Sequence, residues 1–157
     1  MIYIVTGGIN SGKTTKLQSL YKALETGDGF ILPKVFIDGN YVGQQIIRIS
    51  TEMGIPFSFK KDYIPACWDE EYSFDVYSFS RKGFEFASET INSILSDNIS
   101  PVFVDEIGPL ELKEMGFFKI LSLLLGKEQN IYISVRENLL NAVIDKFRIK
   151  DYEIIRV

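Results

Sequence analysis

The chain begins with an apolar run that has no polar alternation. Residues 2–5, Ile-Tyr-Ile-Val, are typical of a central parallel strand that is buried on both faces. After residue 14 the apolar positions change to a helical spacing, and Gly27 follows as the expected C-cap. These helical positions are Leu17, Leu20, Tyr21 and Leu24. The pattern therefore predicts a strand, a short loop and a helix at the start of the chain.

The middle of the chain is rich in strand patterns. Two extended runs, residues 30–37 and 41–50, flank Asp-Gly-Asn at residues 38–40, which is a hairpin signal. Residues 55–60 and 72–79 alternate aromatic and polar side chains, as half-buried strands do. We therefore predict a strand-rich region with a β-hairpin in residues 29–80.

The second half of the chain alternates helix and strand patterns. Helices are predicted over residues 81–97, 111–125 and 137–147, and strands over residues 102–104, 131–135 and 152–157. Such alternation favours an α/β fold with a mostly parallel sheet and helices on both faces. Because the 157 residues contain no repeat and no linker, we expect one domain over residues 1–157.

Composition narrows the classes of function. The net charge of −4 comes from 17 basic and 21 acidic residues without a basic stripe, so nucleic acid is not an expected partner. The single cysteine, Cys67, and a start without signal-peptide features favour a cytoplasmic location. The most apolar stretch, residues 117–125, is too short to span a membrane. Histidine is absent, so any proton transfer would need carboxylates, lysine, tyrosine or water.

Residues 7–14, Gly-Gly-Ile-Asn-Ser-Gly-Lys-Thr, match the phosphate-binding pattern G-x-x-x-x-G-K-[ST], the Walker A loop. The glycines let the backbone curl, so that its N–H groups converge on phosphates at the start of the following helix. Lys13 adds a positive charge. The pattern predicts a nucleoside-triphosphate site. Its predicted nucleotide-binding residues are Gly7, Gly8, Ile9, Asn10, Ser11, Gly12, Lys13, Thr14 and Thr15.

The apolar run at residues 102–104 leads into two adjacent acids, Asp105 and Glu106, which would form a Walker B pair. Mg²⁺ takes oxygen ligands, so Asp105, the Thr14 hydroxyl and phosphate oxygens would hold it. Glu106 could orient or deprotonate a water for in-line attack on the γ-phosphate. If the strands before the loop and before Asp105 are parallel neighbours, both segments lie at the same edge of the sheet. We therefore predict Mg²⁺-dependent hydrolysis, with Lys13 and Glu106 as catalytic residues.

An arginine near the γ-phosphate would help to meet the negative charge of the transition state. Arg136 follows the predicted strand over residues 131–135, so it would emerge at the same edge of the sheet and is the third predicted catalytic residue. Arg81, at the start of the helix over residues 81–97, is a second candidate. The aromatic residues between 63 and 79 would pack in the core, stack on a base or cover a partner, so a protein partner stays possible.

The two motifs together resemble a known family. Residues 7–15 and the string Asp-Glu-Ile-Gly-Pro-Leu-Glu-Leu at 105–112 are similar to the small P-loop nucleoside-triphosphatase family of thermophiles, the cancer-related nucleoside-triphosphatase type. The resemblance implies a P-loop NTPase three-layer sandwich of the division with an additional strand and a catalytic glutamate. It also implies Mg²⁺-dependent hydrolysis of several nucleoside triphosphates with loose base choice.

The chain also departs from this family. After Gly-Phe at residues 29–30 the family usually carries a threonine and a glutamate, whereas this chain has Leu-Pro-Lys at residues 32–34. Glu111 belongs to the family-like string and could orient its neighbours. From their positions on the helix after the acidic pair, however, Glu111 and Glu114 are both expected to be in solvent.

Two other functions stay open. A nucleotide or small-molecule kinase would use Glu106 to accept a proton from a substrate hydroxyl. Kinases of this fold usually carry several arginines around the acceptor pocket, whereas the whole chain has only Arg48, Arg81, Arg136, Arg148 and Arg156. The third reading is a nucleotide-dependent switch or binding module in which hydrolysis is incidental.

Overall fold

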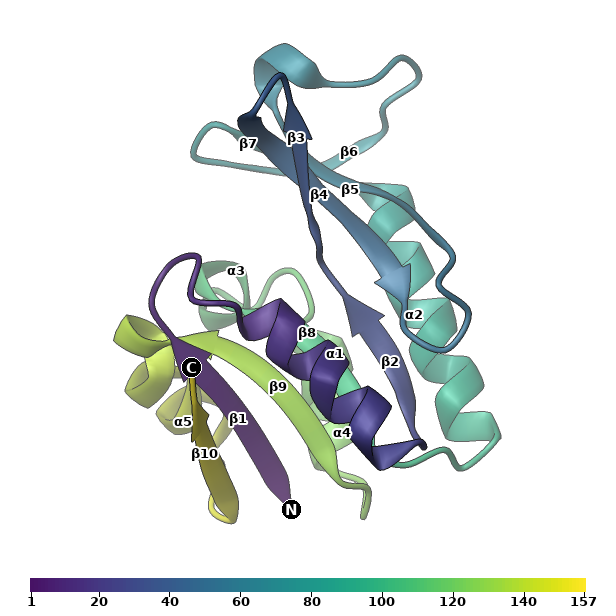
Figure 1. The fold of residues 1–157 in the computed structure, drawn as a ribbon, viewed down its shortest axis with the longest axis vertical. Helices are drawn as coiled ribbons and strands as arrows, with labels where there is room; N and C mark the ends of the chain where they lie inside the picture. Colours follow the sequence, from purple (N-terminus) through teal and green to yellow (C-terminus); the bar gives the residue numbers. More distant parts are fainter.

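One ten-stranded sheet runs through the computed structural model, which describes residues 1–157 (Figure 1). Its first five strands are parallel to one another. In spatial order they are β10 (Tyr152–Arg156), β1 (Ile2–Gly7), β9 (Ile131–Arg136), β8 (Val102–Ile107) and β2 (Asp28–Ile31). This parallel half confirms the predicted α/β class. The strands β1 and β8 are not direct neighbours, because β9 lies between them as the additional strand that the family resemblance implied.

The other half of the sheet is antiparallel and contains the predicted strand-rich region. Here β4 (Asn40–Arg48) pairs with β2, and the sheet continues through β5 (Gly54–Lys60), β7 (Tyr77–Ser80) and β6 (Glu70–Phe74). The predicted hairpin is formed by β3 (Lys34–Ile37) and β4. The stretch 72–79, predicted as one strand, is a second hairpin made by β6 and β7. This half projects beyond the parallel strands (Figure 1).

Helices cover both faces of the sheet, as predicted. On one face, Leu17 of α1 (Lys13–Leu24) packs against Val5, Phe103 and Tyr132. On the opposite face, buried side chains of α2 (Arg81–Ser96), α4 (Phe118–Leu125) and α5 (Leu140–Phe147) pack against strand residues such as Ile4. Because consecutive residues of each central strand point to opposite faces, these strands are apolar throughout. No helix has the length and hydropathy needed to span a membrane.

Two helix boundaries differ from the prediction. The helix predicted over residues 111–125 is divided into α3 (Pro109–Leu112) and α4, with a turn at residues 113–117. The C-cap of α1 is Glu25, with a φ of 54°, rather than Gly27. Two short 3-10 helices, η1 (Lys61–Tyr63) and η2 (Glu137–Leu139), complete the fold. The predicted helix over residues 137–147 therefore starts as η2 and continues as α5.

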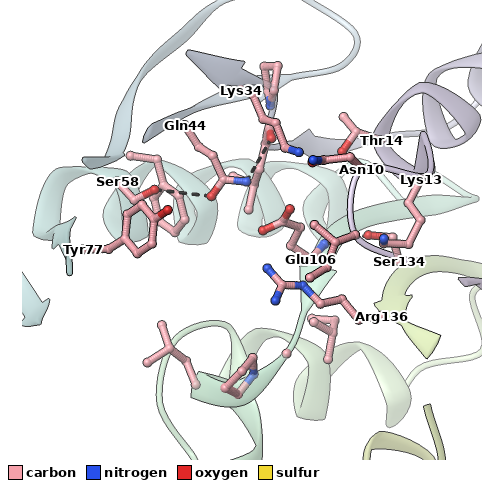
Figure 2. A pocket seen from close by; sticks show the side chains of 18 of the residues that line it. Asn10, Lys13, Thr14, Lys34, Gln44, Ser58, Tyr77, Glu106, Ser134 and Arg136 are labelled. Atoms are coloured by element: carbon pink, nitrogen blue, oxygen red, sulfur yellow. Dashed lines mark hydrogen bonds between the residues drawn. The ribbon is translucent and has the colours of Figure 1, made fainter. Parts of the chain in front are cut away.

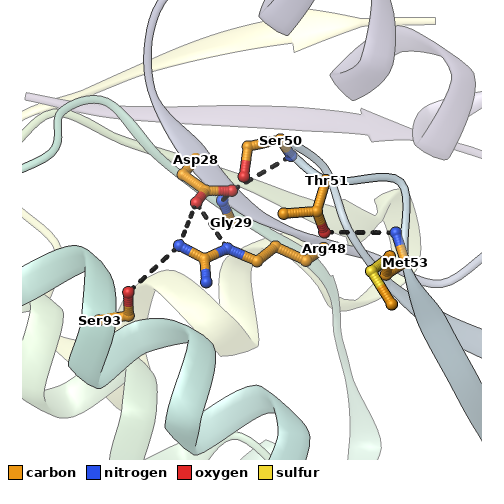
Figure 3. Close-up of polar contacts among 7 residues, drawn as sticks. All are labelled: Asp28, Gly29, Arg48, Ser50, Thr51, Met53 and Ser93. Carbon is orange, nitrogen blue, oxygen red and sulfur yellow. Dashed lines mark hydrogen bonds and ion pairs between the residues drawn. The ribbon is translucent and has the colours of Figure 1, made fainter.

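A buried ion pair joins the two halves of the sheet (Figure 3). The Asp28 carboxylate of β2 accepts hydrogen bonds at 2.7 Å from Nε and Nη2 of Arg48, at the end of β4. Nη2 of Arg48 also donates to Ser93 of α2 at 3.3 Å. The other oxygen of Asp28 accepts the N–H groups of Gly29 and Ser50. Both oxygens of Asp28 therefore have donors, and the pair links β2, β4 and α2 where the two halves of the sheet meet.

Candidate active site

The loop between β1 and α1 is tightly curled. Asn10 and Gly12 have φ angles of 59° and 92°, in the left-handed region. At Gly7 a β-carbon would lie 2.5 Å from Oγ of Ser11 and 2.8 Å from the carbonyl oxygen of Val157, so a larger residue does not fit. The loop therefore has the curl that the Walker A pattern predicts, and α1 begins at Lys13 with its N–H groups directed at the loop.

The Lys13 ammonium lies inside this loop. Its Nζ donates to the carbonyl oxygen of Gly8 at 2.6 Å and to that of Gly7 at 3.3 Å. Burial lowers the pKa of Lys13, and the positive charges of Arg136 and Lys34 lower it further, while the negative charges of Glu106 and Asp105 raise it. The lysine thus lies among charges of both signs at the mouth of the loop, where phosphate oxygens would replace the two carbonyl oxygens.

Asp105 is fully buried and connects four elements of the fold. Its Oδ2 accepts the Thr14 hydroxyl at 2.7 Å and the Leu32 N–H at 2.9 Å, and its Oδ1 accepts the Ser134 hydroxyl and the Glu106 N–H. A carboxylate has about four acceptor positions, and all of them are taken here. The loop and the acidic pair therefore meet through the contact of Thr14 with Asp105. Thr14 lines the cavity described below, whereas Asp105 lies behind it.

Glu106 is turned into the cavity by a bulge in β8. The pairing of β8 with β9 shifts register between Val104 and Ile107, and Glu106 itself has a φ of 55°. Its N–H donates to Oγ of Ser134 at 2.8 Å, which holds the bulge in place. Burial raises the pKa of the Glu106 carboxyl, and the charge of Asp105 raises it further. Bulges and positive φ angles of this kind concentrate at functional sites, where they redirect a side chain.

The two candidate arginines lie in different places. Arg136 ends β9 beside Gly7 of β1, and it lines the same cavity as Glu106. Figure 2 shows its guanidinium close to the Glu106 side chain, between the loop and the antiparallel half of the sheet. Arg81 pairs with Glu71 at 2.9 Å and with Asp69 at 3.7 Å, and it does not line this cavity. Of the two, only Arg136 can reach the loop site.

A cavity of about 1010 Å³ joins the loop to the antiparallel half of the sheet. It contains residues that the sequence analysis did not select, above all Lys34 and Gln44 (Figure 2). Lys34 lies in the segment where the chain departs from the family, so no motif pointed to it. The hairpin of β3 and β4 brings it opposite Thr14 of the loop. Of the aromatic residues that stayed open, Phe74, Tyr77 and Phe79 line this cavity.

Glu111 is buried, with 3% exposure, contrary to the expectation that it is in solvent; Glu114 is exposed as expected. The Glu111 carboxylate accepts the N–H groups of Gly108 and Phe117, both at 2.8 Å. It thereby ties the start of α3 to the start of α4 across the turn that divides them. Burial raises the pKa of Glu111 to about 7, although the two N–H donors oppose the shift. The side chain orders the segment directly after Glu106.

Replacing Glu111 with glutamine is expected to destabilise the fold. The NH₂ group of glutamine would face one of the two buried N–H groups where the carboxyl, ionised or neutral, presents an oxygen, and the unpaired donor costs about 1–3 kcal/mol. Because the folded pKa of Glu111 is raised, its contribution to stability is complete below the unfolded pKa near 4.5 and is lost as the pH rises through about 7. Urea unfolding should therefore give a larger deficit at pH 5 than at pH 8. Equal stability of wild type and variant at both pH values, with exposed Glu89→Gln as control, would contradict this role.

Comparison with known proteins shows the family and the fold of this chain. The family model described as NTPase matches residues 2–157. The solution structure of a human cancer-related nucleoside triphosphatase is similar, with a TM-score of 0.67, 23% identity, and coverage of 99% of this chain and 87% of that chain. The crystal structure of THEP1 from the hyperthermophile Aquifex aeolicus gives a TM-score of 0.74, 20% identity, and coverage of 99% and 89%.

No curated protein sequence matches the chain. At these identities the two solved structures support the fold, while the family model, which spans nearly every residue, supports the family. The resemblance drawn from the two motifs is thereby confirmed. The chain belongs to the NTPase family of nucleoside-triphosphate hydrolases.

Proposed function

We propose that the protein hydrolyses nucleoside triphosphates with Mg²⁺ at the loop between β1 and α1. The observation that carries this proposal is the 2.7 Å hydrogen bond from Thr14 to Asp105. It joins the phosphate loop to the acidic pair, with Glu106 turned into the cavity that the loop lines. This combination of amide nest, hydroxyl, buried acid and second acid is the one that triphosphate hydrolysis requires.

The phosphates would lie at the loop end of the cavity. Residues 9–15 line this end, and their backbone N–H groups would bind the phosphates. The Lys13 ammonium would leave its carbonyl partners for the β- and γ-phosphate oxygens. Arg136, beside Gly7, and Lys34, on the hairpin side of the cavity, add two further positive charges. Together these groups would position the γ-phosphate in front of Glu106 and meet the negative charge that develops on it.

The residues at the loop also fit a magnesium ion. The Thr14 hydroxyl gives its hydrogen to Asp105, so its oxygen lone pairs remain free on the cavity side to serve as a ligand. Asp105, whose four acceptor positions are filled, would act by holding Thr14 in this orientation and by its negative charge. When bound, Mg²⁺ neutralises charge on the β- and γ-phosphates.

Glu106 would accept the proton of the attacking water. Its raised pKa makes the carboxylate a stronger base than an exposed glutamate, and the neighbouring Gln44, Arg136 and Lys34 favour the charged form that the reaction needs. Because Glu106 lies in a bulge of strand β8 and not in a loop, the position of its carboxylate is held by the sheet. Glu106 is therefore our proposed general base, Lys13 stabilises the transferred and leaving phosphates, and Arg136 acts in cis on the γ-phosphate.

Phosphate release from ATP, GTP, CTP and UTP tests this function. We expect release from all four, because the sequence contains no recognisable base-reading motif. Chelation of Mg²⁺ with EDTA should lower the rate by at least about 100-fold, since the ion supplies several kcal/mol of charge stabilisation. Release that continues unchanged in EDTA would refute the proposed metal dependence, and no release from any of the four would refute the hydrolase itself.

A further inference from the structure

The cavity continues past Glu106, away from the loop, into a second compartment. We call this compartment the aromatic chamber and define it by Phe57, Phe79, Phe84, Phe117 and Tyr77. The whole cavity, of about 1010 Å³, is lined by the loop and also by these aromatic residues. The loop end holds the triphosphate under the proposed function. The chamber therefore offers room for a second small molecule on the γ-phosphate side of Glu106.

The walls of the chamber suit a flat ring. The ring centroid of Phe57 lies 5.0 Å from that of Phe84, 5.4 Å from that of Phe117 and 5.7 Å from that of Phe79. The contacts are stacked for Phe117 and edge-on for the other two, and all four rings line the cavity as one aromatic cluster. Aromatic surfaces of this kind bind another ring more favourably than area alone predicts.

The polar groups of the chamber are uncharged and weakly engaged. Gln44 and Ser58, 6% and 2% exposed, lie on neighbouring strands above the rings (Figure 2). The Gln44 amide donates to the Leu32 carbonyl at 3.3 Å, and the Ser58 hydroxyl donates to Oε1 of Gln44 at 3.3 Å. Both bonds are at the long end of the normal range. Such groups can donate to and accept from a neutral ligand, and they supply no cation for an anionic one.

Glu106 lies between the two compartments. Figure 2 shows its side chain with Lys13 and Thr14 on one side and Gln44, Ser58 and Tyr77 on the other. Glu106 and Gln44 line the same cavity, so the base of the hydrolytic reaction also faces the chamber. A hydroxyl group held by the chamber would therefore lie between this base and the γ-phosphate.

We propose that the chamber binds a neutral, ring-bearing alcohol of nucleoside type and that its hydroxyl receives the γ-phosphoryl group. The hydroxyl oxygen forms a bond to the γ-phosphorus, the bond from that phosphorus to the β,γ-bridging oxygen breaks, and the nucleoside diphosphate leaves. The hydroxyl proton passes to the Glu106 carboxylate. This proposal rests on the proposed function, since the donor is the same loop-bound triphosphate. Hydrolysis is then the reaction in which water takes the acceptor's place.

The scarcity of arginines is consistent with such an acceptor. A phosphorylated acceptor would need several cations around its own phosphate, whereas a neutral alcohol needs none. The charged side chains near the chamber are Lys34, Glu106 and Arg136 at its boundary with the loop, Asp75, and Glu111. The carboxylate of Glu111 is already engaged by the N–H groups of Gly108 and Phe117. Because aromatic and uncharged polar side chains form most of its lining, the chamber favours a neutral molecule.

This inference is tested by measuring whether the labelled γ-phosphate is released as inorganic phosphate or transferred to an acceptor. The protein is incubated with Mg²⁺, ATP labelled on the γ-phosphate, and one probe at a time: adenosine, guanosine, cytidine, uridine or benzyl alcohol, with glycerol as the ringless control. We expect at least one ring-bearing probe to carry label as a phosphate ester at about ten times the level found with glycerol or more. Label in inorganic phosphate alone with every probe, or equal ester with glycerol, would overturn the acceptor site. Failure of any label to leave ATP would instead refute the proposed function.

Two variants test whether the phosphate ester is formed by an acceptor bound in the chamber. Ser58→Leu adds bulk inside the chamber and should lower the ratio of ester to phosphate at least about tenfold. Tyr77→Phe keeps the volume and removes one hydroxyl, so it should lower the ratio about fivefold, the effect of one lost hydrogen bond. The ratio is measured within each reaction, so it does not depend on the fraction of folded protein. If Tyr77→Phe and Ser58→Leu both leave the ratio at the wild-type value, the chamber is not the acceptor site.

Discussion

Replacing Glu106 with glutamine is expected to lower kcat for phosphate release by about 10²–10⁴-fold, the usual contribution of a general base. Glutamine has the shape of glutamate but cannot take up the proton of the attacking water. The bulge that holds residue 106 depends on its N–H group, which donates to Ser134, so the substitution leaves the backbone in place. The dissociation constant for ATP, measured by calorimetry with Mg²⁺, should stay within a few-fold of the wild-type value.

The matched control for this variant is Glu89→Gln, on the exposed side of α2. It removes the same charge from the same residue type at a distance from the loop, and we expect wild-type kcat. A loss of less than tenfold in Glu106→Gln would show that another group activates the water. Loss of ATP binding together with kcat would show instead that Glu106 supports the loop.

Lys13→Ala is expected to lower kcat by about 10²–10³-fold, because a charged donor to the developing phosphate charge is lost. Unlike Glu106→Gln, it should also weaken ATP binding, since the ammonium contacts the phosphates before and during the reaction. In the structure Lys13 is bonded only to carbonyl oxygens of its own loop, so its removal should cost little stability. Phosphate release, calorimetry and thermal unfolding measure these three quantities.

The matched control is Lys22→Ala, at the exposed last turn of the same helix. It removes an identical charge from α1 while leaving the loop intact, and we expect wild-type binding and kcat. If Lys13→Ala binds ATP as tightly as the wild type does, the phosphates do not lie in the loop.

The sequence predicted those parts of the candidate site that are formed by residues adjacent in the chain. The loop at residues 7–14 needs only its own glycines to curl, and the Asp105–Glu106 pair needs only the apolar strand before it. Short-range patterns also predicted most helices and strands, because burial on one or both faces determines the spacing of apolar residues. The strand β9 was predicted from its pattern and the family resemblance implied an additional strand, but the place of β9 between β1 and β8 is seen only in the structure.

The remaining site residues are positioned by contacts between distant segments. Lys34 and Gln44 reach the cavity because an antiparallel hairpin folds over the loop, and no local pattern encodes that approach. Glu111 occupies a helix position that is polar in sequence, yet the unpaired N–H groups at the starts of α3 and α4 draw its carboxylate inside. Whether a buried N–H group needs a side-chain acceptor depends on where two helices meet in the folded chain. The spacing of apolar residues in the sequence does not give this information.

The most direct test of the account is a crystal structure of Glu106→Gln with ATP and Mg²⁺ bound. The account predicts that the triphosphate lies in the loop between β1 and α1. Its γ-phosphate should contact Nζ of Lys13 and the Arg136 guanidinium and should face the side chain of residue 106. A nucleotide bound outside the loop, or a γ-phosphate that points away from residue 106, would contradict it.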